Sequence, residues 1–275
     1  MPLKKDDSGR RWVEMEFLVP GTPEQVWHAI ATGPGMTAWF TPTSVEEKVG
    51  GALAFEFGDE NCGQATQLGT VTGWEPPTRF AYEEYGWSGD APPVATEVTV
   101  TSHSGDRCVV RMVHSLFTEK DDWDNELESF EGGWPGFFEV LRVYLRYFAG
   151  QPAASVRVMA GHAGDEAQAW STVTQALNLA GANVGDRCES PSAAPRLAGV
   201  VERVRQDPNS RELMIRLDEP APGVAVIGSF AMGEQSRAVA TIFFYGPDAA
   251  DSAAAQRTTW ADWMRGLLEG ERVAT

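Results

Sequence analysis

The side chains that could act as bases, nucleophiles or metal ligands are scattered along this sequence. The histidines and cysteines lie far apart and show none of the paired spacings of a zinc or redox site: His28, His103, His114, His162, Cys62, Cys108 and Cys188. The sequence contains no phosphate-binding glycine loop, dinucleotide fingerprint or Gly-x-Ser-x-Gly nucleophile elbow. We therefore expect no disulfide framework, no metal and no nucleotide cofactor, and we assign no catalytic residue.

Adjacent carboxylates at Glu83 and Glu84 follow Tyr82 in a stretch that alternates like a strand. Successive side chains of a strand point to opposite faces, so one carboxylate could face a cavity while the other faces water. This geometry does not favour a cooperating acid–base pair. An enzyme would need an inward-facing polar group such as His28, Arg111 or Glu84. We expect Arg111 or His28 to be the residue that orients a ligand.

The charge of the chain argues against two classes of partner. The formal net charge is −17, and 11 basic residues stand against 24 acidic residues up to Gly150, so −13 of it belongs to the first half. Such a surface repels phosphate backbones and anionic membranes. We expect neither nucleic acid nor a membrane as partner.

Length and composition favour a cytoplasmic protein of two domains. The chain has 275 residues and 43% hydrophobic content, enough for sizeable cores. Its first residues are polar, and no stretch is apolar enough to span a membrane. The few lysines all precede Asp121, and many Ala and Arg residues follow, which hints at a GC-rich bacterial coding sequence.

The element that must position any site is a long helix predicted from Trp123 to Phe148. Large apolar side chains recur at helical spacing along one face. They are Trp123, Leu127, Phe130, Trp134, Phe137, Phe138, Leu141, Tyr144, Leu145 and Phe148. Gly132 and Gly133 interrupt the pattern and suggest a bend or a close backbone approach.

Strands are predicted before this helix. The first, Arg11–Val19, is followed by a helix over Pro23–Ala31 that begins with a Thr22/Gln25 capping box, and by a short helix with Met36, Trp39 and Phe40 after the Gly33-Pro34-Gly35 turn. Six further strands form an antiparallel meander with a long Gly58–Gly63 loop. The predicted strands are 43–49, 52–57, 67–74, 78–85, 94–101 and 108–117. Strands followed by one long helix indicate an α+β domain over residues 1–150.

A reduced copy of this pattern is predicted over residues 155–275, after a linker at Gln151–Ala154. Asp165–Trp170 resembles Thr22–Trp27 at an offset of 143, and Val184-Gly185 resembles Val49-Gly50 at 135. Leu197–Val200 resembles Leu68–Val71 at 129, and Trp260 resembles Trp134 at 126. The falling offset predicts lost segments, including the helix with Trp39 and Phe40. The terminal helix is expected over Ser252–Leu268, with an apolar stripe of Ala255, Thr259, Trp260, Trp263 and Leu267.

Five ordered motifs between Val13 and Phe148 resemble the START-like (SRPBCC) superfamily, and within it homologues of the activator of the heat-shock protein 90 ATPase. They are Pro23-Glu24-x-Val26-Trp27, Trp39-Phe40, Gly50-Gly51-x-Leu53-x-Phe55, the segment Gly69–Tyr82, and Gly133-Trp134. The resemblance implies a helix-grip fold, in which a strongly curved antiparallel sheet closes around a long C-terminal helix and leaves a hydrophobic cavity.

Three functions are compatible with this fold. The first is non-enzymatic binding of a small apolar or aromatic molecule in the first domain, the second a cyclase- or hydrolase-like enzyme using the same cavity, and the third a module that binds a chaperone or another protein. We favour binding without catalysis. The candidate ligand-binding residues are Trp39, Phe40, Phe55, Phe57, Tyr82, Trp87, Trp134, Phe137, Phe138 and Leu141.

Overall fold

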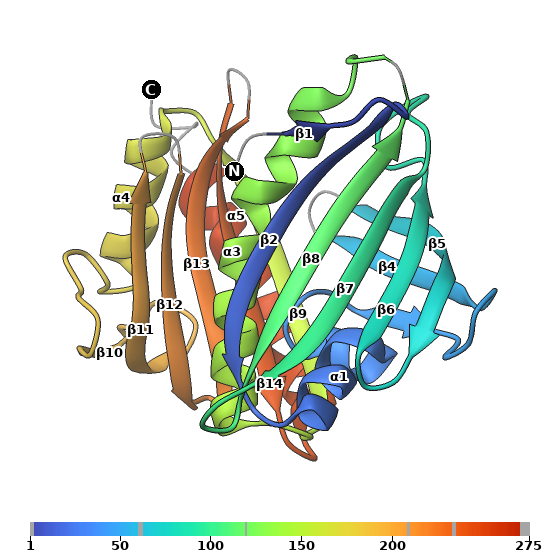
Figure 1. Ribbon diagram of the computed structural model, residues 1–275. Helices are drawn as coiled ribbons and strands as arrows, with labels where there is room; N and C mark the ends of the chain where they lie inside the picture. The colour runs from blue at the N-terminus through green and yellow to red at the C-terminus, as the bar shows by residue number, and fades with distance from the viewer. Residues whose placement is uncertain (1–2, 60–62, 119, 208–209, 233–234, 270–275) are drawn as a thin grey trace. The chain divides into compact units, whose positions relative to one another are not determined.

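In each half of the chain an antiparallel sheet precedes a long helix. The computed structural model describes residues 3–59, 63–118, 120–207, 210–232 and 235–269 (Figure 1). It forms two compact units, one built mainly from residues up to Gly150 and the other from Gln151 onwards. The α+β class is confirmed, and the predicted domains 1–150 and 155–275 remain a prediction at their exact boundaries.

The sheet of the first unit has eight strands in the order β1-β2-β8-β7-β6-β5-β4-β3. Their bounds are β1 (Lys4–Lys5), β2 (Arg10–Pro20), β3 (Thr43–Val45), β4 (Ala52–Asp59), β5 (Gly63–Glu75), β6 (Arg79–Tyr85), β7 (Val94–His103) and β8 (Arg107–Phe117). Figure 1 shows the long strands curving together, with α1 near one end of the sheet. Alternate side chains are buried along β2, as the period-two pattern predicted, and along β7.

The long helix is confirmed as α3 (Asp124–Tyr147), with Trp123 and Phe148 at its caps. Its apolar stripe is buried at Leu127, Trp134, Phe138 and Leu141, while the side chain of Phe130 lies outside those described. Helical structure continues through the two glycines. A methyl group added to Gly133 would meet no atom within 4 Å, so a close backbone approach at Gly133 is wrong.

Two helices follow β2. The helix α1 (Pro23–Ala31) has the predicted bounds and the predicted capping box between Thr22 and Gln25. The next helix was placed wrongly, because α2 (Gly33–Thr37) starts within the Gly-Pro-Gly segment and ends before Trp39. Its N-cap is Thr32, whose side chain accepts a hydrogen bond from the backbone N–H of Gly35. A Cβ on Gly35 would lie 1.9 Å from the carbonyl oxygen of His28, so this glycine permits two helices to meet.

Three other boundaries differ from prediction. The strand predicted at 43–49 ends at Val45, because the chain turns at Lys48 and Gly51, joined by a backbone hydrogen bond of 3.0 Å. The linker predicted at Gln151–Ala154 is shorter, because Ala153 and Ala154 pair with Tyr245 and Phe244. Residues 60–62 of the predicted Gly58–Gly63 loop lie outside the described residues, and the flanking strands extend to Asp59 and Gly63.

The second unit repeats this arrangement with fewer elements. Its six-stranded sheet has the order β10-β11-β12-β13-β14-β9. The elements are β9 (Ala153–His162), α4 (Glu166–Ala176), β10 (Arg187–Glu189), β11 (Ala198–Asp207), β12 (Ser210–Glu219), β13 (Gly223–Met232), β14 (Gln235–Tyr245) and α5 (Ala249–Glu269). Among the described residues between α4 and β10 there is no counterpart of α2. The second unit therefore has the predicted sheet and terminal helix, while its origin as a degenerate copy of the first unit stays a prediction.

The buried stripe of α5 differs from the predicted one. Ala255 and Thr259 are exposed. The buried face instead carries Ala249, Ala253, Trp260, Ala261, Met264 and Leu268. Trp260 is common to both sets, and the predicted Trp263 and Leu267 are partly buried and pack against the core. The small alanines of the buried face permit close packing on the sheet.

One turn shows how closely the two units correspond. In the first, Gly50 N–H donates to the Val71 carbonyl at 2.8 Å, and Val71 N–H donates to the Gly51 carbonyl at 2.9 Å. In the second, Gly185 and Asp186 make the same two bonds with Val201, at 2.8 and 3.0 Å. A strand bulge follows Val71 and Val201 alike. The true offset on this strand is thus 130 residues, one more than the sequence comparison gave.

Candidate ligand-binding site

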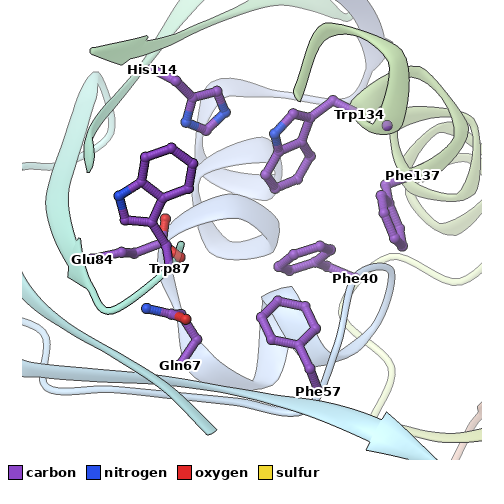
Figure 2. Close-up of a pocket in the computed structure, with 9 residues that line it drawn as sticks. Phe40, Phe57, Gln67, Glu84, Trp87, His114, Trp134 and Phe137 are labelled. Atoms are coloured by element: carbon purple, nitrogen blue, oxygen red, sulfur yellow. The ribbon is translucent and has the colours of Figure 1, made fainter. Parts of the chain in front are cut away.

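The first unit contains a cavity of about 440 Å³ between its sheet and α3. In Figure 2, one side of the cavity carries His114, Trp87, Glu84 and Gln67, and the other carries Trp134, Phe137, Phe40 and Phe57. The residues that line the cavity are Phe40, Phe57, Gln67, Glu84, Trp87, His114, Gly133, Trp134 and Phe137. Its volume lies within the range of about 300–1,000 Å³ that is typical of small-molecule sites.

The apolar wall is centred on Phe40, in the segment after α2. Its ring lies 4.8 Å from Trp134 and 4.9 Å from Phe137, both on α3. Phe57 of β4 completes the wall at 5.6 Å from Phe40. These centroid distances are those of favourable aromatic pairs, so the wall is held by packing among its own members.

The ten predicted residues divide into two layers. Five line the cavity: Phe40, Phe57, Trp87, Trp134 and Phe137. The other five lie behind them in the core: Trp39, Phe55, Tyr82, Phe138 and Leu141. Trp39, for example, donates from Nε1 to the Ala29 carbonyl at 2.9 Å and packs 5.3 Å from Phe138. The second layer therefore supports the first.

Trp87 enters the cavity from the loop between β6 and β7. Its Nε1–H donates to the carbonyl of Pro92 at 2.8 Å, which closes the loop on itself. The ring is half-buried and borders the cavity. A loop residue is thus held in place at the cavity wall.

Glu84 brings a carboxyl group into this apolar surrounding. It shares the inner face of β6 with Phe80 and Tyr82, whereas Glu83 points to the other face, as strand alternation predicted. Burial raises the pKa of Glu84 to about 7. Within the described part of the chain, no donor forms a hydrogen bond or ion pair with this carboxyl group. An acid that titrates near neutrality therefore faces the cavity.

His114 is the second polar group of the sheet wall. It is buried on β8, its Nδ1 lies 2.8 Å from the Thr96 hydroxyl, and its ring stacks on Trp134 at 5.7 Å. Burial lowers the pKa of His114 to about 3, so the ring is neutral at physiological pH. The pKa of neighbouring Tyr82 is raised well above its usual value, first by burial and then by Glu84. Glu84 is thus the group among these three that can change charge near pH 7.

The expectation that His28 or Arg111 orients a ligand is wrong. His28 is exposed on α1 and does not line the cavity. Arg111 lies on the opposite face of β8 from His114, where its Nε donates to Glu14 at 2.8 Å. Strand alternation in β8 indicates that His114 faces inward, because it lies on the same face as the buried Val110 and Met112. Gln67 and Gly133 gave no comparable signal.

Strand register identifies the counterparts of the polar residues in the second unit. Gly69 pairs with Glu84 as Gly199 pairs with Leu217, and Val71 pairs with Tyr82 as Val201 pairs with Ile215. The next two strands then match Thr96 with Ala225 and His114 with Ile242. All four counterparts are aliphatic and buried in the core. At these four positions polar side chains are therefore confined to the first unit, whereas Ser229, Ser236 and His162 are buried at other inner-face positions of the second sheet.

The described residues contain no cluster of His, Cys, Asp or Glu that could hold a metal ion. None of their helices is long and apolar enough to cross a membrane.

Together, the curved antiparallel sheet, the long helix and the cavity between them define a START-like helix-grip domain. Residues 20–146 match the model of the family described as Activator of Hsp90 ATPase homolog 1-like protein. This segment therefore belongs to the START-like (SRPBCC) superfamily, as the sequence motifs implied. No curated protein sequence matches the chain.

Several solved structures are similar to the chain. MLL2253 from Mesorhizobium loti is 22% identical over 50% of this chain and 97% of its own, with a TM-score of 0.43. CalU16 from Micromonospora echinospora is 18% identical over 53% of this chain and 83% of its own, with a TM-score of 0.41. DynU16, from the dynemicin biosynthetic locus, is 19% identical over 98% of this chain and 100% of its own, with a TM-score of 0.42.

Proposed function

We propose that the first unit binds a small molecule with an apolar or aromatic body in the cavity beneath α3. One observation carries the proposal: a space of about 440 Å³ is walled by aromatic side chains and yet contains a carboxyl group. A protein core of that composition would ordinarily be filled. The matching inner face of the second unit is filled with Leu217, Ile215, Ala225 and Ile242.

A glycine offers a test that removes no existing contact. Gly133 lines the cavity from α3, and a side chain placed there would project into open space. Gly133→Leu should fill part of the cavity and improve helix propensity by about 0.5–1 kcal/mol. Gly266→Leu is the matched control, because Gly266 is also helical, exposed and free of neighbours within 4 Å, but lies on α5.

The measurement is fluorescence titration with 1-pyrenemethanol, a neutral aromatic probe. We expect binding to the wild type and to Gly266→Leu, and at least about tenfold weaker binding to Gly133→Leu, since the leucine occupies the site. Native mass spectrometry of freshly purified protein should detect a co-purified small molecule that Gly133→Leu lacks. Equal binding by all three proteins would place the probe elsewhere and refute the proposal.

The alternative function is catalysis by the carboxyl group of Glu84. A carboxyl group with a pKa of about 7 in a cavity can act as a general acid or base. If a bound molecule from the wild type were chemically converted, and Glu84→Gln bound it without conversion, the cyclase- or hydrolase-like function would replace binding alone.

A further inference from the structure

The charge on the described residues that line the cavity has a single sign. Among these residues Glu84 is the one acid, and none is Lys or Arg. His114 cannot supply a positive charge at neutral pH, because burial favours its neutral form. An anionic ligand would therefore meet a carboxylate and no counter-charge, which disfavours it by repulsion and by loss of hydration.

A cation would meet several favourable groups in the same space. The carboxylate of Glu84 can accept a charge-assisted hydrogen bond from an ammonium group. Trp87 and Trp134 border the cavity, and tryptophan faces attract cations. The residues up to Gly150 together carry −13 of the formal net charge, and this negative charge raises the local concentration of cations.

The second unit indicates that the carboxyl group is not needed for the fold. At the position that corresponds to Glu84, the second unit has Leu217, which is 3% exposed within a packed core. A leucine of similar size thus satisfies the same place in the same strand arrangement. Keeping a carboxyl group in an apolar surrounding costs free energy, and this cost calls for a role outside folding.

We propose that the cavity selects a molecule with an aromatic or otherwise apolar body and one basic nitrogen, which Glu84 holds while the aromatic wall packs against the body. This inference rests on the proposed function and specifies its ligand class. The ammonium group lies toward Glu84 and Trp87, and the apolar body lies toward Phe40 and Phe137. His114, as a neutral ring, borders the site without repelling the cation.

Three probes of one shape test the charge preference. They are 1-pyrenemethylamine, 1-pyrenemethanol and 1-pyrenecarboxylate, titrated by fluorescence at pH 8. We expect the amine to bind at least about tenfold more tightly than the alcohol, since a hydrogen bond to a charged group contributes about 1.5–3 kcal/mol. The carboxylate should bind more weakly than the alcohol.

Two neighbouring glutamates give a matched pair of variants. Glu84→Gln should abolish the advantage of the amine over the alcohol, measured as the ratio of their dissociation constants in the same variant. Glu83→Gln removes the same charge from the next residue, on the other face of β6, and should keep the advantage. Loss of the advantage in both variants would mean that distant surface charge is responsible, and its retention in Glu84→Gln would assign it to other groups; either result overturns the proposal.

A pH series on the wild type supplies a test without mutation. The titratable groups that face Glu84 are Tyr82 and His114, whose pKa values lie well above and far below neutrality. Glu84 alone among them ionises near pH 7. The amine should therefore bind about tenfold more weakly at pH 6 than at pH 8, whereas the alcohol should not.

The outcomes separate this inference from the proposed function. If the alcohol binds, Gly133→Leu blocks it and the amine has no advantage, the cavity binds ligands but does not select amines. If none of the three probes binds the wild type, both proposals are wrong. An amine advantage that follows Glu84 and pH supports both.

Discussion

At the scale of single residues, the most informative side chain is that of Glu84, because its burial costs free energy. Glu84 lies among aromatic rings, and burial alone raises its pKa from 4.5 to about 7. A group whose pKa is higher in the folded than in the unfolded state binds more protons when folded. Its carboxyl group therefore opposes folding increasingly as the pH rises from about 4.5 to above 7.

Neutralising this group should stabilise the protein. We expect Glu84→Gln to raise the free energy of unfolding by about 1–3 kcal/mol at pH 8 and by less than about 1 kcal/mol at pH 5, where the wild-type carboxyl group is already protonated. Urea melts of both proteins at the two pH values measure the difference. A destabilised variant at pH 8 would mean that Glu84 has a structural partner.

His114 should show the opposite dependence on pH. Its pKa falls from 6.5 to about 3 on folding, so the unfolded chain binds the proton more tightly. Stability from this residue is complete above about pH 6.5 and is lost as the pH falls, by about 2 kcal/mol at pH 5. Imidazole nitrogen chemical shifts measured by NMR should keep their neutral values down to about pH 4. Protonation of the ring near pH 6 in the folded protein would contradict its burial.

At the scale of elements, α3 is held to the sheet through one aromatic cluster. Trp134 is 8% exposed and lies within 6.2 Å of Trp39, 4.8 Å of Phe40 and 5.7 Å of His114. Its ring therefore packs α3 against the segment after α2 and against β8. The same ring also borders the cavity, so one residue both packs α3 against the sheet and forms part of the cavity wall.

We expect Trp134→Ala to lower the free energy of unfolding by about 3–5 kcal/mol, because truncating a buried tryptophan removes many contacts at once. Trp87→Ala is the comparison, since Trp87 borders the same cavity from a loop and should cost less than about 2 kcal/mol. Denaturant melts monitored by circular dichroism distinguish the two. A cost below about 1 kcal/mol for Trp134→Ala would show that the ring faces open space on most sides.

The elements themselves were largely predictable, because strands and long helices leave strong periodic patterns. Val13, Met15 and Val19 marked β2, and the capping residues Thr22 and Gln25 marked the start of α1. Short elements were less predictable, since α2 depends on the Thr32 cap and on the close approach at Gly35. Such contacts exist only after folding.

The sequence predicted an apolar cavity but did not predict which of the inward-facing residues line it. Apolar spacing identifies residues that face inward, yet it cannot tell Trp134, which borders open space, from Phe138, which is fully buried behind it. That distinction depends on how far the sheet curves away from the helix. The polar wall was harder still, because strand alternation puts His114 on the buried face with Val110 and Met112 but does not show that this face borders a cavity.

At the scale of the whole molecule, two units with similar strand order differ in their inner faces. Both units share strand order, a long final helix and the turn at Gly50 and Gly185. The positions that hold Tyr82, Glu84, Thr96 and His114 in the first unit hold Ile215, Leu217, Ala225 and Ile242 in the second. We therefore expect the two units to respond differently to a ligand.

Hydrogen exchange should locate that response. With 1-pyrenemethylamine at about 100 times its dissociation constant, the occupied unit gains about 2.7 kcal/mol of stability. The backbone amides of β6 and β8 should exchange more slowly, and those of their counterparts β12 and β14 should change less. Equal protection of both units would indicate either a second site or unfolding of the whole chain as one cooperative unit.

The carboxyl group in the aromatic cavity also links ligand binding to the lifetime of the protein in the presence of proteases. An empty first unit keeps an ionised Glu84 without a counter-charge at pH 8, and it opens more readily than a unit in which a cation neutralises that charge. Proteases cut chains that open, at a rate that follows the population of the open form. Empty copies of the protein should therefore be digested first, so that a cell would retain the copies that carry their ligand.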